Sequence, residues 1–463
     1  MFLKTISIEN FRVLKDIEIQ FEQEFTPTIF PLGSLNGGGK STLLQLVFTL
    51  LHCSFKKQRH QYLVNLLSTI TFTKRDTVTT LAKFEIKHDD KAFDLEFIVS
   101  DNHFEGQNLN VFLDVEELEQ KLAENKALEA KYSSLLKLEE EINSSNRVSP
   151  LRWLEMSRYL NSKTDRELYE IARKNGSYDE YKKCLAHLLR SYKAMLNHDN
   201  DLELMLKEEQ SKHSKIRHLL KSKEMLYVTH FDNEKVLLCQ TNIDDTDILT
   251  KMSDKVYLAA PSTQVFLFLS AQEKETFFSK ESGIINYIDY LNKAKEKLTG
   301  FFPYDFASSD LIIKSFEKAR DKDFEEALEN GKYGEHFKKL TTALNRFLID
   351  KTITVNKQLS NIVFKLENNE EALLPEDLSH GELKKLGIYI WLNHYGIEDS
   401  LVLMDEIEIG LHPDWQYEIV NELQEWSKNN QFILATHSYE LCQALTPSHV
   451  KELEPKLIKT NKK

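Results

Sequence analysis

The stretch Leu32-Gly33-Ser34-Leu35-Asn36-Gly37-Gly38-Gly39-Lys40-Ser41-Thr42 decides the fold of this chain. It follows a short apolar strand pattern and precedes an apolar helical run that ends near His52. Glycines let backbone N–H groups close around phosphate oxygens, and the start of the next helix presents its positive end to the same charge. The pattern therefore predicts a Walker A loop. The expected ATP-binding residues are Asn36, Gly37, Gly38, Gly39, Lys40, Ser41 and Thr42, with Lys40 on the β- and γ-phosphates and Ser41 on Mg²⁺.

Two later stretches supply the rest of a phosphoryl-transfer site. Leu401 to Met404 is a continuous apolar run, typical of a strand buried on both faces, and Asp405 and Glu406 follow it. We expect Asp405 to hold Mg²⁺ through water and Glu406 to act as the general base on the attacking water. His437 follows another apolar strand pattern and is expected to hydrogen-bond the γ-phosphate.

The segment Leu378-Ser379-His380-Gly381-Glu382 precedes an amphipathic helical pattern. Ser379 and Glu382 have the spacing of a capping box, and a serine hydroxyl with helix N-terminal amides also forms an anion site. Both interpretations apply if the cap becomes a phosphate ligand in another subunit. The expected residues in trans are Ser379, His380, Gly381 and Glu382, which predicts a homodimer or a higher homo-oligomer.

Composition limits the remaining possibilities. The chain has 463 residues, is 41% hydrophobic and carries a formal net charge of −13. Any DNA contact must therefore be local, for example at Lys56 to His60, where a solvated loop or helix face is the alternative. The four cysteines are scattered without a Cys-x-x-Cys pair, which favours a reducing cytoplasm and disfavours structural zinc. No apolar run approaches the roughly 18 residues of a membrane span, so we expect no membrane association.

The fold class expected from these motifs is α/β, an ABC-type ATPase head with a mixed sheet and flanking helices, interrupted by a large, mostly helical insertion. Two charged helical arms joined by a further helical piece, Pro150 to Asn197, form the middle of the insertion. A hairpin is expected between residues 81–87 and 92–100. The predicted divisions are an N-terminal ATPase lobe at 1–112, a helical arm insertion at 113–225, a mixed and mainly helical insertion at 226–354, and a C-terminal ATPase lobe at 355–463.

With these motifs the chain resembles the SMC/RecF/OLD branch of ABC-class ATPases. The resemblance rests on the four motifs and on Ile8 to Arg12 and Ile409 to Pro413. It implies that Arg12 lies near the nucleotide and that Leu411-His412-Pro413 lies at a dimer interface. His380 departs from the glycine or serine usual in the signature. The family's Q-loop glutamine has no clear counterpart, and Gln58 and Gln61 are weak candidates.

More narrowly, Ala259 to Gln264 and the helical insertion resemble the restriction-system-associated ATPases, among them the PtuA family of the Septu anti-phage system. That resemblance implies a separate HNH nuclease partner. No intrinsic nuclease is expected, because too few residues follow His437 for a further domain. Asp76 with Glu85 and Lys87 matches a metal-nuclease pattern only loosely, and a solvated strand face is the favoured interpretation.

The leading functional hypothesis is a cytoplasmic, ATP-hydrolysing dimerisation switch that senses or regulates a nuclease partner in anti-phage defence. The alternative is a RecF-like DNA-repair ATPase that acts directly on DNA. A transporter ATPase is a third class, and Asn10-Phe11-Arg12, the Leu411-His412-Pro413 turn and the helical insertion disfavour it.

Overall fold

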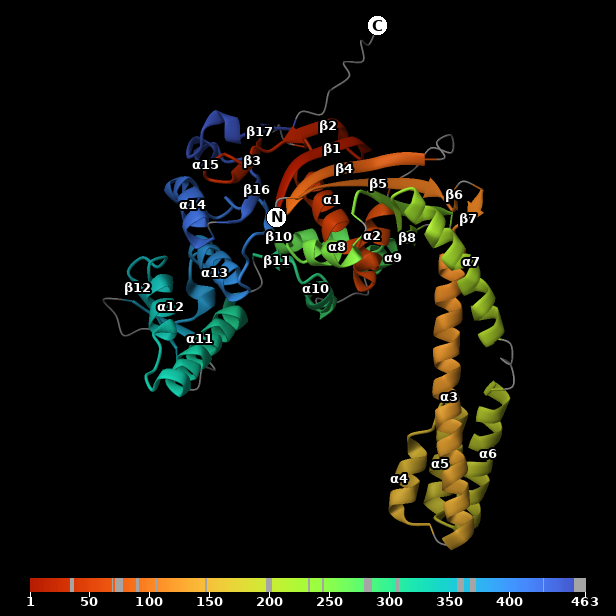
Figure 1. Ribbon diagram of the computed structural model, residues 1–463. Coiled ribbons are helices and arrows are strands. Elements are labelled where there is room, and N and C mark those ends of the chain that lie inside the picture. Colours follow the sequence, from red (N-terminus) through yellow and green to blue (C-terminus); the bar gives the residue numbers. More distant parts are fainter. Residues whose placement is uncertain are drawn as a thin grey trace. The chain divides into compact units, whose positions relative to one another are not determined.

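The computed structural model (Figure 1) describes two compact units, one made of residues 1–101 and 220–463 and the other of residues 102–219. The first unit contains all the motifs named above and is called the head here; the second is called the insertion. The described residues are 1–33, 37–68, 70, 78–88, 91–104, 106–145, 148–196, 202–231, 234–243, 245–278, 285–304, 308–355, 362–366, 372–427 and 429–453.

The head contains an antiparallel sheet that the N-terminal strands begin. Its strand order is β2-β1-β4-β5-β9-β8. The strands are β1 (Phe2–Phe11), β2 (Leu14–Gln20), β4 (Val78–His88), β5 (Lys91–Asp101), β8 (Met225–Phe231) and β9 (Lys235–Thr241). The antiparallel pairing of β4 with β5 confirms the predicted hairpin, whose tip at residues 89–90 lies outside the described residues.

A second sheet carries the motifs. Its order is β11-β10-β15-β16-β3-β17, and all its neighbouring strands are parallel. The strands are β3 (Ile29–Gly33), β10 (Val256–Ala260), β11 (Phe301–Pro303), β15 (Leu401–Asp405), β16 (Gln431–Ala435) and β17 (Lys451–Glu452). β15 and β16 are buried along their whole length, as continuous apolar runs in a parallel sheet require.

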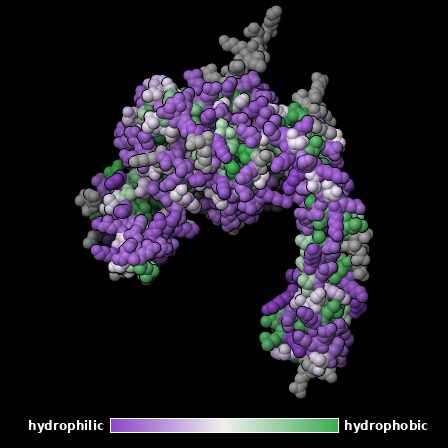
Figure 2. All heavy atoms as spheres, viewed as in Figure 1, coloured by the Kyte–Doolittle hydropathy of each residue, from purple (hydrophilic) through white to green (hydrophobic). Residues whose placement is uncertain are grey.

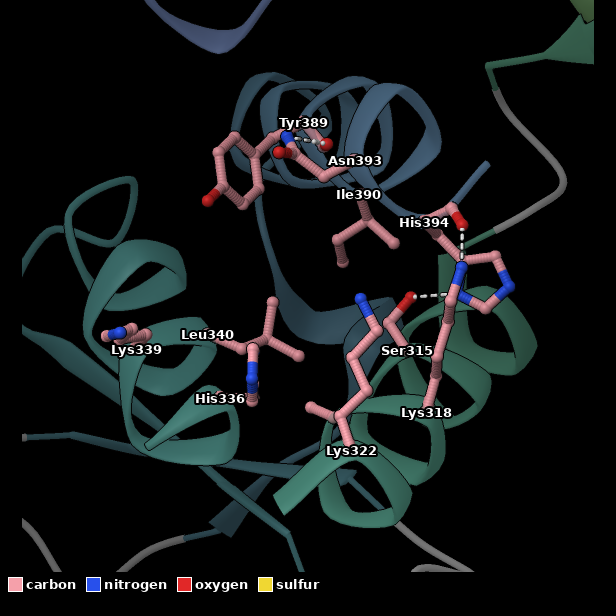
Figure 3. Close-up of a pocket in the computed structure, with 11 residues that line it drawn as sticks. Ser315, Lys318, Lys322, His336, Lys339, Leu340, Tyr389, Ile390, Asn393 and His394 are labelled. Atoms are coloured by element: carbon pink, nitrogen blue, oxygen red, sulfur yellow. Dashed lines mark hydrogen bonds between the residues drawn. The ribbon is translucent and has the colours of Figure 1, made fainter. Parts of the chain in front are cut away.

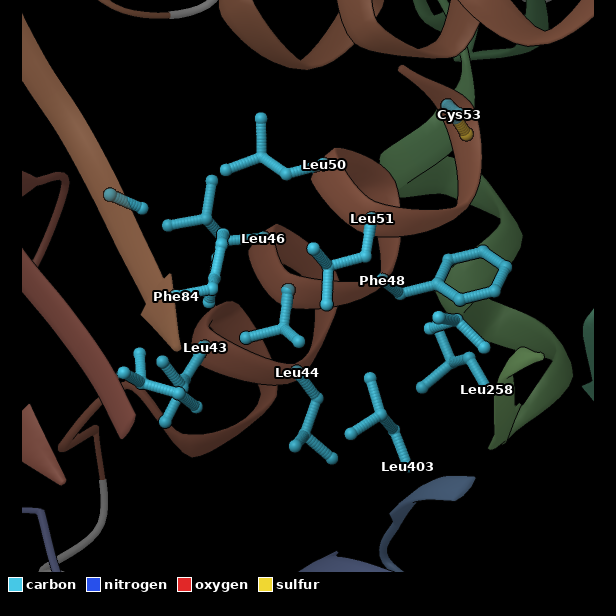
Figure 4. Packing of buried hydrophobic residues seen from close by; sticks show 14 of the residues in the cluster. Leu43, Leu44, Leu46, Phe48, Leu50, Leu51, Cys53, Phe84, Leu258 and Leu403 are labelled. Atoms are coloured by element: carbon cyan, nitrogen blue, oxygen red, sulfur yellow. The ribbon is translucent and has the colours of Figure 1, made fainter. Parts of the chain in front are cut away.

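Helix α1 (Lys40–Cys53) packs in the core between the two sheets. Leu43, Leu46 and Leu50 are fully buried in the same cluster as Phe84 of the antiparallel sheet and Leu403 of the parallel sheet. Figure 4 shows these side chains around the helix. The helix is apolar on nearly all sides because both sheets cover it, and this packing fixes the position of its first residue, Lys40.

The other head helices and strands surround this core. The helices are α2 (His60–Leu67), α8 (Thr246–Ser253), α9 (Ala271–Phe278), α10 (Ile285–Lys297), α11 (Ser308–Asn330), α12 (His336–Asn345), α13 (His380–His394), α14 (Pro413–Trp426) and α15 (Tyr439–Gln443). Short 3-10 turns lie at η1 (Lys57–Arg59), η2 (Ser262–Phe268), η3 (Pro375–Asp377) and η4 (Pro447–His449). A small antiparallel sheet contains β12 (Lys351–Val355), β13 (Ile362–Leu366) and β14 (Ala372–Leu373). A second core, which includes Phe316, Phe364 and Trp391, joins this sheet to α11 and α13.

The insertion is helical apart from a two-stranded ribbon. Its elements are β6 (His103–Phe104), β7 (Gln107–Asn108), α3 (Val111–Ser145), α4 (Pro150–Ser157), α5 (Lys163–Asn175), α6 (Tyr178–Leu196) and most of α7 (Leu202–Ser222). Its own core gathers Leu135 and Ile142 of α3 with Trp153, Tyr169 and Tyr181 of the shorter helices. The predicted helical piece from Pro150 to Asn197 corresponds to α4, α5 and α6.

The structural division differs from the predicted one. Residues 226–354, predicted to be a mixed and mainly helical insertion, contribute β8 and β9 to the antiparallel sheet and β10 and β11 to the parallel sheet. These strands pair with partners far away in the chain, and pattern alone does not reveal such partners. The visible surface in Figure 2 is mostly hydrophilic, in keeping with a charged-residue content of 29%. Among the described helices, none has the length and apolar character to cross a bilayer.

Candidate functional site

Three motifs meet at the carboxyl edge of the parallel sheet. The strands β3, β16 and β15 are neighbours, and their registers align Leu32 with Ala435 and Ala435 with Asp405. The glycine-rich loop, His437 and Glu406 follow these three aligned positions. In open parallel sheets this edge is where ligands bind. Residues that are distant in sequence therefore share one site, as the sequence motifs required.

The glycine-rich loop approaches the turn between β1 and β2 closely. Gly39 has a φ of 91°, a backbone conformation that favours glycine. A Cβ atom there would lie 2.7 Å from Cδ2 of Leu14 and 2.9 Å from Cγ2 of Val13. Gly39 is also the N-cap of α1 and supplies no side-chain cap. The loop is thus shaped to leave helix N-terminal amides for an anion. Asn36 lies outside the described residues.

Arg12 belongs to this same turn. Its φ is 53°, and its guanidinium carbon lies 5.3 Å from the ring centre of Phe11. Burial lowers the pKa of Arg12. Its neighbours Val13 and Leu14 lie close to Gly39, so the turn that carries Arg12 lies beside the glycine-rich loop.

Asp405 is joined to α1 by hydrogen bonds. The Ser41 hydroxyl donates to Asp405 Oδ1 at 2.9 Å. The amide of Gln264, in η2 after β10, donates to Asp405 Oδ2 at 2.9 Å, and Gln45 of α1 donates to Gln264 Oε1. Asp405 is only 2% exposed, and its burial raises the pKa of this carboxyl to about 7 against the opposing hydrogen bond from Ser41. Hydroxyl and carboxylate oxygens are donors that Mg²⁺ prefers, so Ser41 and Asp405 fit the predicted ion.

Gln264 is a site residue that sequence analysis did not assign. Gln58 and Gln61, the weak candidates for the Q-loop, are both exposed, and the structure shows Gln264 at Asp405 instead. The available signal was the strand pattern of Val256 to Ala260 just before it. That strand lies beside β15 in the sheet, and only the sheet order shows this.

Glu406 begins the turn after β15 in an uncommon backbone conformation. Its φ is 53°, and its N–H donates to the carbonyl of Ala435 at 2.9 Å. The Lys384 ammonium of α13 donates to the carbonyls of Glu406 at 3.1 Å and Ile409 at 2.8 Å. A non-glycine residue at positive φ persists only when its surroundings hold it there. These bonds fix the turn that carries the expected general base.

His437, which follows the central strand β16 of the three, lies beside Lys40. Lys40 Nζ lies 3.5 Å from His437 Nδ1. Burial lowers the pKa of Lys40, and the charges of Glu408 and Asp405 oppose this shift. The backbone N–H of His437 donates to Glu408 Oε1 at 2.7 Å. Glu408 is 8% exposed, and its Oε2 has no hydrogen-bond partner among the described residues. Sequence analysis did not identify Glu408 as a site residue.

The predicted signature segment begins α13 as a capping box. The Ser379 hydroxyl accepts from the N–H of Glu382 at 3.3 Å, and the Glu382 carboxylate accepts from the N–H of Ser379 at 3.1 Å. Burial would raise the pKa of Glu382, but hydrogen bonds from Lys351 and Ser379 outweigh it and lower that pKa. Ser379 and His380 are exposed and Gly381 is buried. A Cβ at Gly381 would lie 2.7 Å from the carbonyl oxygen of Gly410, so the cap packs closely on the turn after Glu406.

Two further predictions concerned a DNA-contacting patch at Lys56 to His60 and a nuclease-like pattern at Asp76, Glu85 and Lys87. Arg59, part of the candidate DNA patch, is 2% exposed and binds Asp254 at 3.0 Å, and Lys56 pairs with Asp254 at 2.5 Å. Neither a DNA-contacting nor a solvated Arg59 was correct, because the buried guanidinium is bonded to Asp254 inside the head. Glu85 pairs with Lys4 at 2.8 Å on a strand face, and Asp76 lies outside the described residues. The described residues contain no group of three or more His, Cys, Asp or Glu that could hold a metal ion.

Comparison with known proteins identifies the family. The family model AAA_15, described as an AAA ATPase domain, matches residues 1–442, and the chain belongs to this family. It is an ATPase of this class.

Shorter matches connect it to particular relatives. It is 41% identical over 51 residues to the Retron Ec83 probable ATPase of Escherichia coli, which is 11% of this chain and 9% of that protein. It is 47% identical over 60 residues to the Retron Vc95 probable ATPase of Vibrio cholerae serotype O1 biovar El Tor, 13% of this chain and 11% of that protein. The chain thus spans about a tenth of the curated relatives it matches.

Two solved structures match most of the chain at low similarity. One is the Pyrococcus furiosus Smc head domain with an extended coiled coil bound to the C-terminal domain of ScpA, at 11% identity and a TM-score of 0.33 over 97% of this chain and 95% of that one. The other is SmcHead bound to the C-winged helix domain of ScpA, at 9% identity and a TM-score of 0.35 over 98% and 97%. The head fold rests on the two sheets around α1 described above.

Proposed function

We propose that this protein is an ATP-hydrolysing switch whose head closes on a second copy of itself when ATP is bound. The observation that carries the proposal is the meeting of Lys40, Ser41, Asp405 and His437 at one sheet edge, with Glu406 next to Asp405. The proposed ATP-binding residues are those of the loop from Asn36 to Thr42, with Arg12 at the border.

Each residue has a distinct role in this proposal. Lys40 and the first amides of α1 bind the phosphates. Ser41 and Asp405 would hold Mg²⁺, which supplies charge neutralisation at the phosphates when bound, and Gln264 positions Asp405 through its hydrogen bond. Glu406 takes the proton of the attacking water. His437 forms a hydrogen bond to the terminal phosphate. Glu408 positions the backbone of His437 by accepting a 2.7 Å hydrogen bond from its N–H.

The signature segment supports dimerisation. Ser379 and His380 are exposed at the start of α13, where helix amides face an approaching anion. In a dimer, Ser379 of one copy would face the nucleotide held by Lys40 of the other. Gly381 against Gly410 couples this cap to the turn after Glu406, so nucleotide contact in trans and the catalytic turn would move together.

The biological setting is part of the proposal. The retron ATPase relatives favour anti-phage defence. The scattered cysteines favour the cytoplasm, and the Septu-like resemblance favours a separate HNH nuclease as the regulated partner. The RecF-like alternative predicts that DNA itself stimulates turnover. Co-purification from the native operon separates them: a nuclease that co-purifies and changes activity with ATP supports the switch, and DNA-stimulated turnover without any partner supports the repair role.

The catalytic assignment is tested by Glu406→Gln. We expect ATP turnover to fall about 10²-fold or more while ATP binding persists, because the amide cannot accept the proton of water. The same variant should accumulate as a dimer with ATP in size-exclusion chromatography with light scattering. Glu418→Gln, an exposed change of the same kind on α14, is the matched control. Equal turnover by Glu406→Gln and the parent protein would refute the assigned base.

A further inference from the structure

A cavity in the head is lined by α11, α12 and α13. Its volume is about 260 Å³. Figure 3 shows the side chains that line it, with Lys318 and Lys322 on α11, Lys339 on α12, and Asn393 and His394 on α13. None of the residues named in the ATP site lines this cavity. It is a separate feature of the fold.

The charge of this cavity is opposite to that of the whole chain. Its described lining includes three lysines and two histidines and no aspartate or glutamate, although the chain carries a net charge of −13. Acidic residues are about as frequent as basic ones along residues 308–345, so composition alone does not produce this result. The fold brings lysines of α11 and α12 to the same cavity, and a concave site focuses their field.

Nearby carboxylates are already engaged outside the lining. Asp323 accepts from the backbone N–H groups of His336 at 2.6 Å and Phe337 at 3.0 Å. Glu326 binds His336 Nε2 at 2.7 Å. These bonds hold α11 against α12. Glu326 is the carboxylate partner of the lining residue His336, whereas the described lining offers the three lysines no carboxylate.

The α13 wall is ordered by two polar contacts. The Ser315 hydroxyl and His394 Nδ1 are 3.0 Å apart, and Lys318 Nζ donates to the carbonyl of His394 at 2.5 Å. Burial lowers the pKa of His394, and the charges of Lys318 and Lys314 lower it further. Lys318 therefore places a positive charge beside this end of α13, where it would attract an anion.

We propose that this cavity binds a phosphate group carried by a small molecule. Lys322 and Lys339, on opposite helices, are exposed ammonium donors with flexible stems, which suits a tetrahedral anion. Leu340 and Ile390 give the cavity an apolar side for the rest of the ligand. At about 260 Å³ it lies just below the roughly 300–1,000 Å³ typical of sites for drug-sized ligands. It therefore accommodates one or two phosphate groups with a compact attachment.

The position of the cavity gives the ligand a regulatory consequence. Tyr389, Asn393 and His394 occupy the last turns of α13, and the other end of this 15-residue helix follows Ser379. A bound anion would brace α13 against α11 and α12, about 20 Å along one helix from the signature segment. This consequence rests on the proposed switch, whereas ligand binding itself does not.

Binding is tested by isothermal titration calorimetry on the full chain at low salt, with pyrophosphate, 5′-AMP and inorganic phosphate as separate probes. All proteins carry Lys40→Ala, which silences the glycine-rich loop and keeps the two sites distinguishable. Lys322→Gln with Lys339→Gln is expected to weaken pyrophosphate binding at least about tenfold. If 5′-AMP binds more tightly than pyrophosphate, the nucleoside contributes through contacts with Leu340 and Ile390. If the two affinities are equal, the phosphate groups account for the binding.

The matched control is Lys332→Gln with Lys338→Gln, which removes the same charge from the same part of the head but alters no lining residue. It should bind pyrophosphate within about twofold of its parent. ATP turnover of the Lys322/Lys339 variant with Lys40 intact verifies folding. Unchanged binding in the Lys322/Lys339 variant, an equal loss in the control, or binding of oligonucleotides only would each overturn the proposal.

Discussion

Two buried aspartates, one in the head and one in the insertion, have nearly equal exposure and opposite ionisation behaviour. Asp405 is 2% exposed and Asp165 is 3% exposed. Burial raises the pKa of Asp405 to about 7. Burial would also raise the pKa of Asp165, but hydrogen bonds from Ser162, Asn161 and His187 outweigh it and hold that pKa below its ordinary value. Burial alone therefore does not determine the state of a carboxylate.

The difference lies in the partners of each carboxylate. Asp165 closes a capping box with Ser162, accepts from the backbone N–H groups of Ser162 at 2.9 Å and Asn161 at 3.2 Å, and lies 3.1 Å from His187 Nε2. Among the described residues, Asp405 accepts side-chain bonds from Ser41 and Gln264, and the charges of Glu406 and Glu408 also raise its pKa. In the insertion, hydrogen bonds stabilise the charged form of Asp165. In the head, the charged form of Asp405 lacks sufficient compensation, and a bound cation would supply it.

The largest expected effect is on turnover in the head. Asp405→Asn keeps the size of the side chain and removes the charge that would hold Mg²⁺, so we expect ATP turnover to fall about 10²- to 10³-fold. A coupled-enzyme ATPase assay at saturating Mg²⁺ measures this. Asp165→Asn is the matched control and should stay within about twofold of the parent protein. Parent-like turnover by Asp405→Asn would remove Asp405 from the site.

The next effect is the pH dependence of stability without Mg²⁺ or nucleotide. The raised pKa means that folded Asp405 holds its proton more tightly than unfolded Asp405, so the parent protein loses stability as pH rises from 3.8 to about 7. Asp405→Asn lacks this loss. Its stability relative to the parent should therefore grow by about 1–3 kcal/mol between pH 5 and pH 8 in chelator.

Asp165→Asn should show no such trend over the same range. The lowered pKa of Asp165 contributes stability that is complete above the unfolded value of 3.8 and is lost only below it. Scanning calorimetry of both variants measures the two slopes. A flat difference for Asp405→Asn, or a rising one for Asp165→Asn, would contradict the contrast between the two carboxylates.

The third effect is confined to the insertion. Asp165→Ala removes the acceptor of two backbone N–H groups at the start of α5, which should cost about 2 kcal/mol. Hydrogen exchange of peptides from Lys163–Asn175 reports this as faster opening. Asp179→Ala, an exposed aspartate in the first turn of α6, is the control and should cost well under 1 kcal/mol. Equal protection in Asp165→Ala and the parent would show that the cap is not needed.

The candidate site was predictable in part because several of its residues belong to short motifs of neighbouring positions in the sequence. Glycines before Lys40, paired carboxylates after an apolar strand, and Ser379 three positions before Glu382 each specify a local geometry that the structure contains. Gln264 and Glu408 carry no comparable local pattern. Gln264 reaches Asp405 because β10 pairs with β15, and Glu408 reaches the backbone of His437 because β15 pairs with β16.

The sequence by itself determined which segments form a glycine-rich loop, buried strands and capped helices, since periodicity, glycine content and cap residues act over a few neighbouring positions. Only the tertiary structure decided that residues 226–303 complete both large sheets, that Arg59 is an internal link, and that three lysines of a charge-balanced segment line one cavity. Each of these depends on pairing between segments far apart in the chain. Such pairing follows from the burial of apolar faces against one another, which no local pattern encodes.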